Sequence, residues 1–210
     1  MEVVARVNGV CGELVLRQAG SHHEIIANGV FLMDTRNGES ERLMVRAAAD
    51  RMPPGATMVI GGLGVAFSLR EALAHPAVGS VVVVEREPAV VEWNRTVLGN
   101  ADALADPRVR LVRADLLTWL PTAGTFGALC LDIDNGPEWT VDRGNASLYG
   151  AEGLAMLDAA LVPGGVLAIW SAARAPAFTA ALAARYGEVE TLAIPVPRGE
   201  PDLVFLVTAP

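Results

Sequence analysis

Short apolar runs alternate with longer amphipathic segments from residue 53 to residue 184, and this alternation constrains the fold more than any other feature. The pattern predicts strands joined by helices, and therefore a parallel sheet with helices on both faces. The last two apolar runs, at 188–195 and 203–207, have only a turn between them, which predicts an antiparallel hairpin at one sheet edge. We therefore expect an α/β fold with a doubly wound, mostly parallel, seven-stranded sheet. The other expected strands are 57–60, 80–84, 109–112, 128–131 and 166–170, and the expected helices are 66–74, 88–98, 116–120, 146–161 and 176–184.

A small antiparallel β unit is predicted before this sheet. Asn28-Gly29 stands between two apolar runs, which is a strong hairpin signal. Pro53-Pro54-Gly55 ends the helix that follows the unit. We expect residues 1–52 to form the β-hairpin unit with its connecting helix, and residues 53–210 to form the main domain. The strands expected in the unit are 13–16, 24–26 and 30–33, and the connecting helix is 39–52.

Charge and composition exclude several classes of function. The formal net charge is −8, and all 16 basic residues are arginine. An acidic chain without a basic run is poorly suited to nucleic acid, and the lack of lysine excludes Schiff-base and P-loop lysines. No apolar run is long enough to span a membrane, and residues 1–6 do not have the form of a secretory signal, so we expect a cytoplasmic protein. The cysteine and histidine spacing indicates no metal site.

The first candidate site is a glycine loop that follows the strand predicted at 57–60. Glycines here allow a tight turn and a close approach of the backbone to a ligand, and the helix that follows adds oriented N–H groups. Phe67 stands where a dinucleotide fingerprint requires its third glycine, so the loop favours an adenosyl ligand without a pyrophosphate. A plain tight turn is the alternative. The residues assigned to the loop are Gly61, Gly62, Leu63 and Gly64.

Two acids follow the next two strands. Glu85 comes directly after the valine run 81–84, where a carboxylate can accept hydrogen bonds from both hydroxyls of a ribose. Asp115 ends the third strand, where it can accept a hydrogen bond from an adenine amino group, cap the helix that follows, or do both. A solvated charge at a strand end is the alternative for Glu85. The neighbouring Arg86 and Leu116 are assigned to the same binding set.

A polar loop follows the fourth strand, which we expect to lie beside the first strand at the topological switch point of the sheet. Asp132 and Asp134 are the candidate catalytic acids, because such acids bind an ammonium group or take a proton from an attacking amine. Asn135 and Asp134 are expected to contact the substrate, although the same residues also favour a turn. Trp139 and Tyr149 are candidates for walls of the substrate pocket, with ordinary core packing as their alternative.

Six segments of the sequence, among them the glycine loop and the strand end at Glu85, together resemble the spermidine synthases. These are the polyamine aminopropyltransferases within the S-adenosylmethionine-dependent methyltransferase superfamily. The resemblance implies a class I methyltransferase-type domain at 53–210, with Glu85 on the ribose, Asp115 on the adenine and Asp132 as the catalytic acid. It also implies that Glu41 lies in a gate segment near the substrate, and that the protein is an oligomer, for which we expect a homodimer. The matching segments are Val59-Ile60-Gly61-Gly62, Leu69-Arg70-Glu71, His75-Pro76-Ala77-Val78, Val84-Glu85, Asp106-Pro107-Arg108-Val109 and Leu161-Val162-Pro163-Gly164-Gly165-Val166.

Departures from the family pattern leave two reactions open. The glycine loop lacks the aspartate of the family, the loop after Asp132 is shorter, and Met33 lies near the place of a gate glutamine. Without that aspartate, the N–H groups of residues 62–65 are expected to be available to a donor carboxylate. This favours, by a small margin, methyl transfer from S-adenosylmethionine to a small cationic amine acceptor. Aminopropyl transfer from decarboxylated S-adenosylmethionine is the alternative, and a non-catalytic adenosyl-binding protein is a further one.

Overall fold

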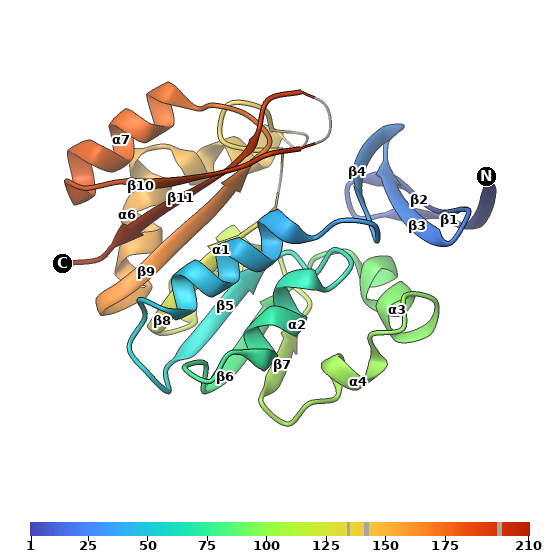
Figure 1. The fold of residues 1–210 in the computed structure, drawn as a ribbon, viewed down its shortest axis with the longest axis horizontal. Coiled ribbons are helices and arrows are strands. Elements are labelled where there is room, and N and C mark those ends of the chain that lie inside the picture. The colour runs from blue at the N-terminus through green and yellow to red at the C-terminus, as the bar shows by residue number, and fades with distance from the viewer. Residues whose placement is uncertain (134, 141–142, 197–198) are drawn as a thin grey trace.

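The computed structural model describes residues 1–133, 135–140, 143–196 and 199–210, and it contains two separate sheets (Figure 1). The larger sheet has seven strands in the order β10-β11-β9-β8-β5-β6-β7. The five strands from β5 to β9 pair in parallel, and β10 and β11 form an antiparallel hairpin at one edge. The predicted fold class is therefore confirmed. The strands are β5 (Thr57–Gly61), β6 (Ser80–Val84), β7 (Val109–Val112), β8 (Phe126–Leu131), β9 (Leu161–Ser171), β10 (Glu190–Ile194) and β11 (Asp202–Thr208).

Helices cover both faces of this sheet because strand residues alternate between two apolar clusters. Ile60 and Val83 pack with α1 to α4 on one face, whereas Val59 and Val84 pack with α5 to α7 on the other. None of the helices in the described part of the chain has the length and apolar character needed to cross a bilayer. The helices are α1 (Glu39–Ala49), α2 (Phe67–Ala74), α3 (Pro88–Thr96), α4 (Ala101–Leu104), α5 (Leu116–Trp119), α6 (Ala151–Ala159) and α7 (Pro176–Tyr186), with 3₁₀ turns at Leu120–Thr122 and Arg143–Tyr149.

One predicted helix is wrong in its extent. The segment 146–161 is divided into a 3₁₀ turn and α6, because Gly150 has the extended backbone of ψ 176°. Strand β9 begins at Leu161, earlier than expected. Its early part is held by the end of the chain, since Gly164 donates to the Ala209 carbonyl and Ala209 donates to the Gly165 carbonyl.

The N-terminal sheet has four antiparallel strands in the order β1-β2-β3-β4. Asn28 and Gly29 adopt φ of +50° and +81° and form the predicted hairpin turn between β3 and β4. The first strand was not predicted, because its side chains are mostly exposed and give no clear apolar run. The strands are β1 (Glu2–Gly9), β2 (Gly12–Ala19), β3 (His22–Ala27) and β4 (Val30–Asp34).

A buried carboxylate ties the N-terminal sheet to the main domain. Glu87, at the start of α3, is 8% exposed and accepts hydrogen bonds from the backbone N–H groups of Val10 (2.9 Å) and Cys11 (3.1 Å) in the β1–β2 turn. The turn lies so close that a Cβ on Gly9 would be 2.4 Å from the Glu87 carboxylate. Glu87 is the N-cap residue of α3, but its side chain makes no capping hydrogen bond. It connects the two sheets instead.

Replacing Glu87 with Ala should weaken this docking. The change leaves two partly buried N–H groups without their acceptor, so we expect the free energy of unfolding to fall by about 2 kcal/mol. Chemical denaturation measures that change, and hydrogen exchange should show faster exchange in β1 and β2. Glu92→Ala, at an exposed position of the same helix, is the control and should have little effect. Equal stability of the two variants would contradict this role of Glu87.

Candidate active site

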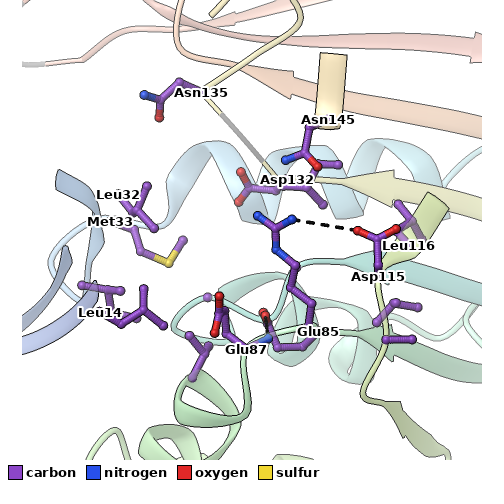
Figure 2. Close-up of a pocket in the computed structure, with 18 residues that line it drawn as sticks. Leu14, Leu32, Met33, Glu85, Glu87, Asp115, Leu116, Asp132, Asn135 and Asn145 are labelled. Atoms are coloured by element: carbon purple, nitrogen blue, oxygen red, sulfur yellow. Dashed lines mark hydrogen bonds and ion pairs between the residues drawn. The ribbon is translucent and has the colours of Figure 1, made fainter. Parts of the chain in front are cut away.

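A pocket lies at the carboxyl ends of β5, β6, β7 and β8, where the chain order reverses between β5 and β8. Ligands of open α/β sheets bind at this topological switch point. The N-terminal sheet closes the pocket from the other side with an apolar wall made of Leu14, Ile25, Leu32 and Met33 (Figure 2). Of the predicted binding residues, the structure brings together around the pocket Gly62, Gly64, Glu85, Arg86, Asp115, Leu116, Asp132 and Asn135.

The glycine loop after β5 bends sharply and is held rigidly. Gly62 and Gly64 have φ of +91° and +52°, and Ala66 has φ of +68°. A Cβ on Gly62 would lie 2.5 Å from the Asp132 carbonyl oxygen, so only glycine fits there. Two buried amides hold the loop from below, since Asn94 donates to the Gly64 carbonyl (2.8 Å) and Asn100 to the Val65 carbonyl (3.1 Å). No motif in the sequence pointed to these two asparagines.

Glu85 lies at the bottom of the pocket and connects the glycine loop to α3. Its carboxylate is 8% exposed and accepts hydrogen bonds from the N–H groups of Leu63 (2.9 Å) and Glu87 (2.8 Å), one on each oxygen. Burial raises the pKa of Glu85, and the two N–H donors partly offset that rise. A carboxylate has about four lone-pair sites, so each oxygen keeps one for a ligand hydroxyl.

The loop N–H groups are less available than the sequence suggested. The Gly62 N–H donates to the Val84 carbonyl (2.9 Å), and the Leu63 N–H donates to Glu85. Two of the four groups expected to receive a donor carboxylate are therefore already used within the protein. This removes much of the physical basis for preferring a carboxylate-bearing donor.

Asp115 has the structural role that its sequence context predicted. It caps α5 by accepting the Thr118 N–H (3.1 Å). Its other oxygen lies 3.9 Å from Nη1 of Arg86, which follows β6 and also lines the pocket. The capping bond leaves part of the carboxylate exposed to the pocket, so an adenine contact stays a prediction.

Asp132 lies at the end of β8, where its N–H donates to the Gly61 carbonyl (3.1 Å). Two further acids act on it, Glu41 from the start of α1 and Asp202 from the start of β11. Burial raises the pKa of Asp132 well above its usual value, and the negative charges of Glu41 and Asp202 raise it further. We call Asp132, Glu41 and Asp202 the acidic cluster. Sequence analysis missed Asp202, because its strand is far from the others in the chain.

The other predicted substrate contacts have different outcomes. Asn135 lines the pocket, and its carbonyl accepts the Ala172 N–H (2.9 Å). Tyr149 does not line it but packs edge-on against Phe178 in the core, with ring centroids 5.5 Å apart. Trp139 is 59% exposed and also lies outside the lining. Asp134 lies outside the described residues.

No metal site accompanies the pocket in the described ranges. Among these residues, no group of three or more histidine, cysteine, aspartate or glutamate side chains is arranged to hold a metal ion. Within the acidic cluster, repulsion between carboxylates contributes to the raised pKa values of Asp132 and Glu41.

Fold and pocket together define a class I methyltransferase-type domain with an appended N-terminal β sheet. Solved structures with this fold include spermidine synthase from Thermotoga maritima, with a TM-score of 0.79, 16% identity, and 99% of this chain and 72% of that chain covered. A spermidine synthase in complex with the transition state analogue AdoDATO gives the same TM-score of 0.79 and 16% identity, and covers 99% of this chain and 73% of that chain.

In sequence, the chain is a relative of the polyamine aminopropyltransferases. It is 31% identical over 176 residues to the polyamine aminopropyltransferase of Mycobacterium tuberculosis, which covers 80% of this chain and 32% of that protein. The chain therefore spans about a third of the length of such curated relatives. No family model matches it. The resemblance inferred from the sequence motifs is confirmed, and these relatives favour the aminopropyl alternative over methyl transfer.

Replacing Glu85 with Ala should weaken the binding of adenosyl ligands. A charged bidentate contact with a ribose contributes about 1.5–3 kcal/mol, so we expect the dissociation constant for methylthioadenosine to rise more than about tenfold. Isothermal calorimetry measures this constant, and circular dichroism checks that the variant is folded. Glu71→Ala, in α2 outside the pocket lining, where Glu71 pairs with Arg46 of α1, is the control. Unchanged affinity in Glu85→Ala would exclude Glu85 as the ribose ligand.

Proposed function

We propose that this chain catalyses aminopropyl transfer from decarboxylated S-adenosylmethionine to a small cationic amine. One observation carries the proposal: the charges that line the pocket are predominantly negative. Glu85, Glu87, Asp115 and Asp132 line it, whereas Arg86 is the one basic side chain among the described lining residues, and it faces Asp115. The decarboxylated donor carries a sulfonium and an ammonium group without a carboxylate, so its charge is complementary to this lining.

The donor is assigned to the part of the pocket between Asp115 and the glycine loop. In this arrangement Glu85 accepts the two ribose hydroxyls, Asp115 accepts the adenine amino group, and Leu116 contacts the adenine ring. The bend at Gly62 and Gly64 lets the backbone approach the ligand closely. The likeness to a structure with a bound transition state analogue supports this placement, because both chains have the same fold.

The acceptor is assigned to the side of the pocket where Asp132 lies. An amine arrives as an ammonium ion and must lose a proton before it can attack. The raised pKa of Asp132 suits this carboxylate to take that proton, while Glu41 and Asp202 attract the ammonium ion. The amine nitrogen then forms a bond to the aminopropyl carbon next to sulfur. The bond between carbon and sulfur breaks, its electron pair stays on sulfur, and methylthioadenosine leaves.

Methyl transfer from intact S-adenosylmethionine is supported less well. That donor carries a carboxylate, whose burial without a partner costs several kcal/mol. The Gly62 and Leu63 N–H groups that were expected to bind it are committed to Val84 and Glu85. A small amine acceptor and a homodimer remain predictions, as does a role for Asp134 in the acceptor site.

Incubation with decarboxylated S-adenosylmethionine and a set of diamines tests the activity, with methylthioadenosine measured by chromatography. We expect turnover with at least one diamine. Asp132→Asn should abolish transfer, because the change removes the base, while donor binding is largely retained, because the ribose and adenine contacts of Glu85 and Asp115 remain. Asp158→Asn, which alters an ion pair with Arg185 on the surface, is the matched control. Transfer that survives in Asp132→Asn would show that Asp132 is not the base.

The acidic cluster predicts how the reaction depends on pH. Asp132 must be ionised to accept a proton, so the rate should fall as pH drops through its raised pKa. Glu41→Gln removes one negative neighbour and lowers the pKa of Asp132, so the acidic limb of the kcat profile should move to lower pH. Glu39→Gln, at an exposed position in the same helical turn, should leave it unchanged. An acidic limb that stays in place in Glu41→Gln would contradict the coupling.

A further inference from the structure

The space beside Gly64 on the pocket wall is filled by a side chain from the other sheet. A Cβ on Gly64 would lie 2.4 Å from Sδ and 2.6 Å from Cε of Met33, which comes from β4. Both residues line the pocket. The Met33 thioether therefore occupies the position that any side chain at residue 64 would need.

Hydrogen bonds from two buried amides hold the loop in place beside Met33. Asn94 and Asn100 hold the carbonyls of Gly64 and Val65, and Asn100 also donates to Oδ1 of Asn94 at 2.8 Å. On the other side, Met33 is fixed by its pairing with Ile25, which is 1% exposed. The hydrogen-bonded loop and the buried strand pair thus keep the Met33 thioether at this part of the pocket wall.

The position of Met33 relative to the acids indicates which part of a donor it would meet. Figure 2 shows Asp115 on one side of the pocket, Met33 and Leu32 on the opposite side, and Glu85 and Asp132 between them. With adenine at Asp115 and ribose at Glu85, the chain attached to sulfur extends toward Met33 and Asp132. Met33 therefore lies where decarboxylated and intact donors differ.

We propose that Met33 determines donor specificity by presenting an apolar surface to the tail attached to sulfur. This inference rests on the proposed function. A thioether has no N–H or O–H to donate, and the nearby Gly62 and Leu63 N–H groups are already used. The side of a carboxylate that lies against Met33 would lose its hydration without gaining a partner there. An aminopropyl tail, in contrast, places methylenes against Met33 and its ammonium group toward the acidic cluster.

Calorimetric titration of the two donors, without an acceptor, tests the proposal. The wild-type protein should bind decarboxylated S-adenosylmethionine more tightly than S-adenosylmethionine. Met33→Lys supplies a cation to the carboxylate and repels the aminopropyl ammonium, so the ratio of the two dissociation constants should shift toward the intact donor by about tenfold or more. Met33→Leu keeps an apolar wall of similar volume and should keep the wild-type ratio.

The outcomes separate this proposal from the proposed function. If the wild-type protein prefers the decarboxylated donor and Met33→Lys keeps the same ratio, Met33 does not determine specificity, and the proposed function still stands. If the wild-type protein binds neither donor or prefers the intact one, both proposals are overturned. Should Met33→Lys fail to fold, Met33→Ala admits water to the same place, and a shift of about threefold toward the intact donor is then expected.

Discussion

The Glu85 carboxylate is the interaction on which the rest of the site depends. It accepts one N–H from the glycine loop and one from the start of α3, so it fixes the two segments that form the bottom of the pocket. The neighbouring Glu87 receives the β1–β2 turn and thereby fixes the N-terminal sheet at the same point. Two adjacent carboxylates thus set the positions of the loop, the helix and the apolar wall. Both also line the pocket and so contribute to its predominantly acidic lining.

The carboxylates gathered at the pocket make their own ionisation unfavourable in the free protein, and they favour the binding of cationic ligands. Burial disfavours the ionisation of these acids, as the raised pKa values of Glu85, Glu41, Asp132 and Asp202 show. A doubly cationic donor and a cationic acceptor would relieve the repulsion when they bind. An acid with a raised pKa is also a better proton acceptor for an ammonium ion. The same physical feature therefore favours cationic ligands and provides the base.

Local patterns were enough to predict the sheet, both hairpins, and the glycine loop with Glu85, Asp115 and Asp132 at the strand ends. These features are encoded within a few residues of one another, by apolar runs, by turn residues and by acids at strand ends.

Contacts between distant segments were not predictable in this way. Asp202 lies near Asp132 because β11 belongs to the same sheet, and Met33 reaches Gly64 because the N-terminal sheet packs on the main domain, where Glu87 holds the β1–β2 turn. Tyr149 carries the pattern of a pocket residue, but packing against Phe178 places it in the core. The expected preference for a carboxylate-bearing donor is less well supported than its alternative for a similar reason, since the hydrogen bonds from Gly62 and Leu63 are visible only in three dimensions.

A crystal structure of the protein with methylthioadenosine tests the central claim most directly. The account predicts that both ribose hydroxyls lie within hydrogen-bond distance of the Glu85 carboxylate. The adenine amino group should lie at Asp115, and the sulfur atom between Met33 and Asp132. A nucleoside bound elsewhere, or bound in this pocket with its ribose away from Glu85, would contradict the account.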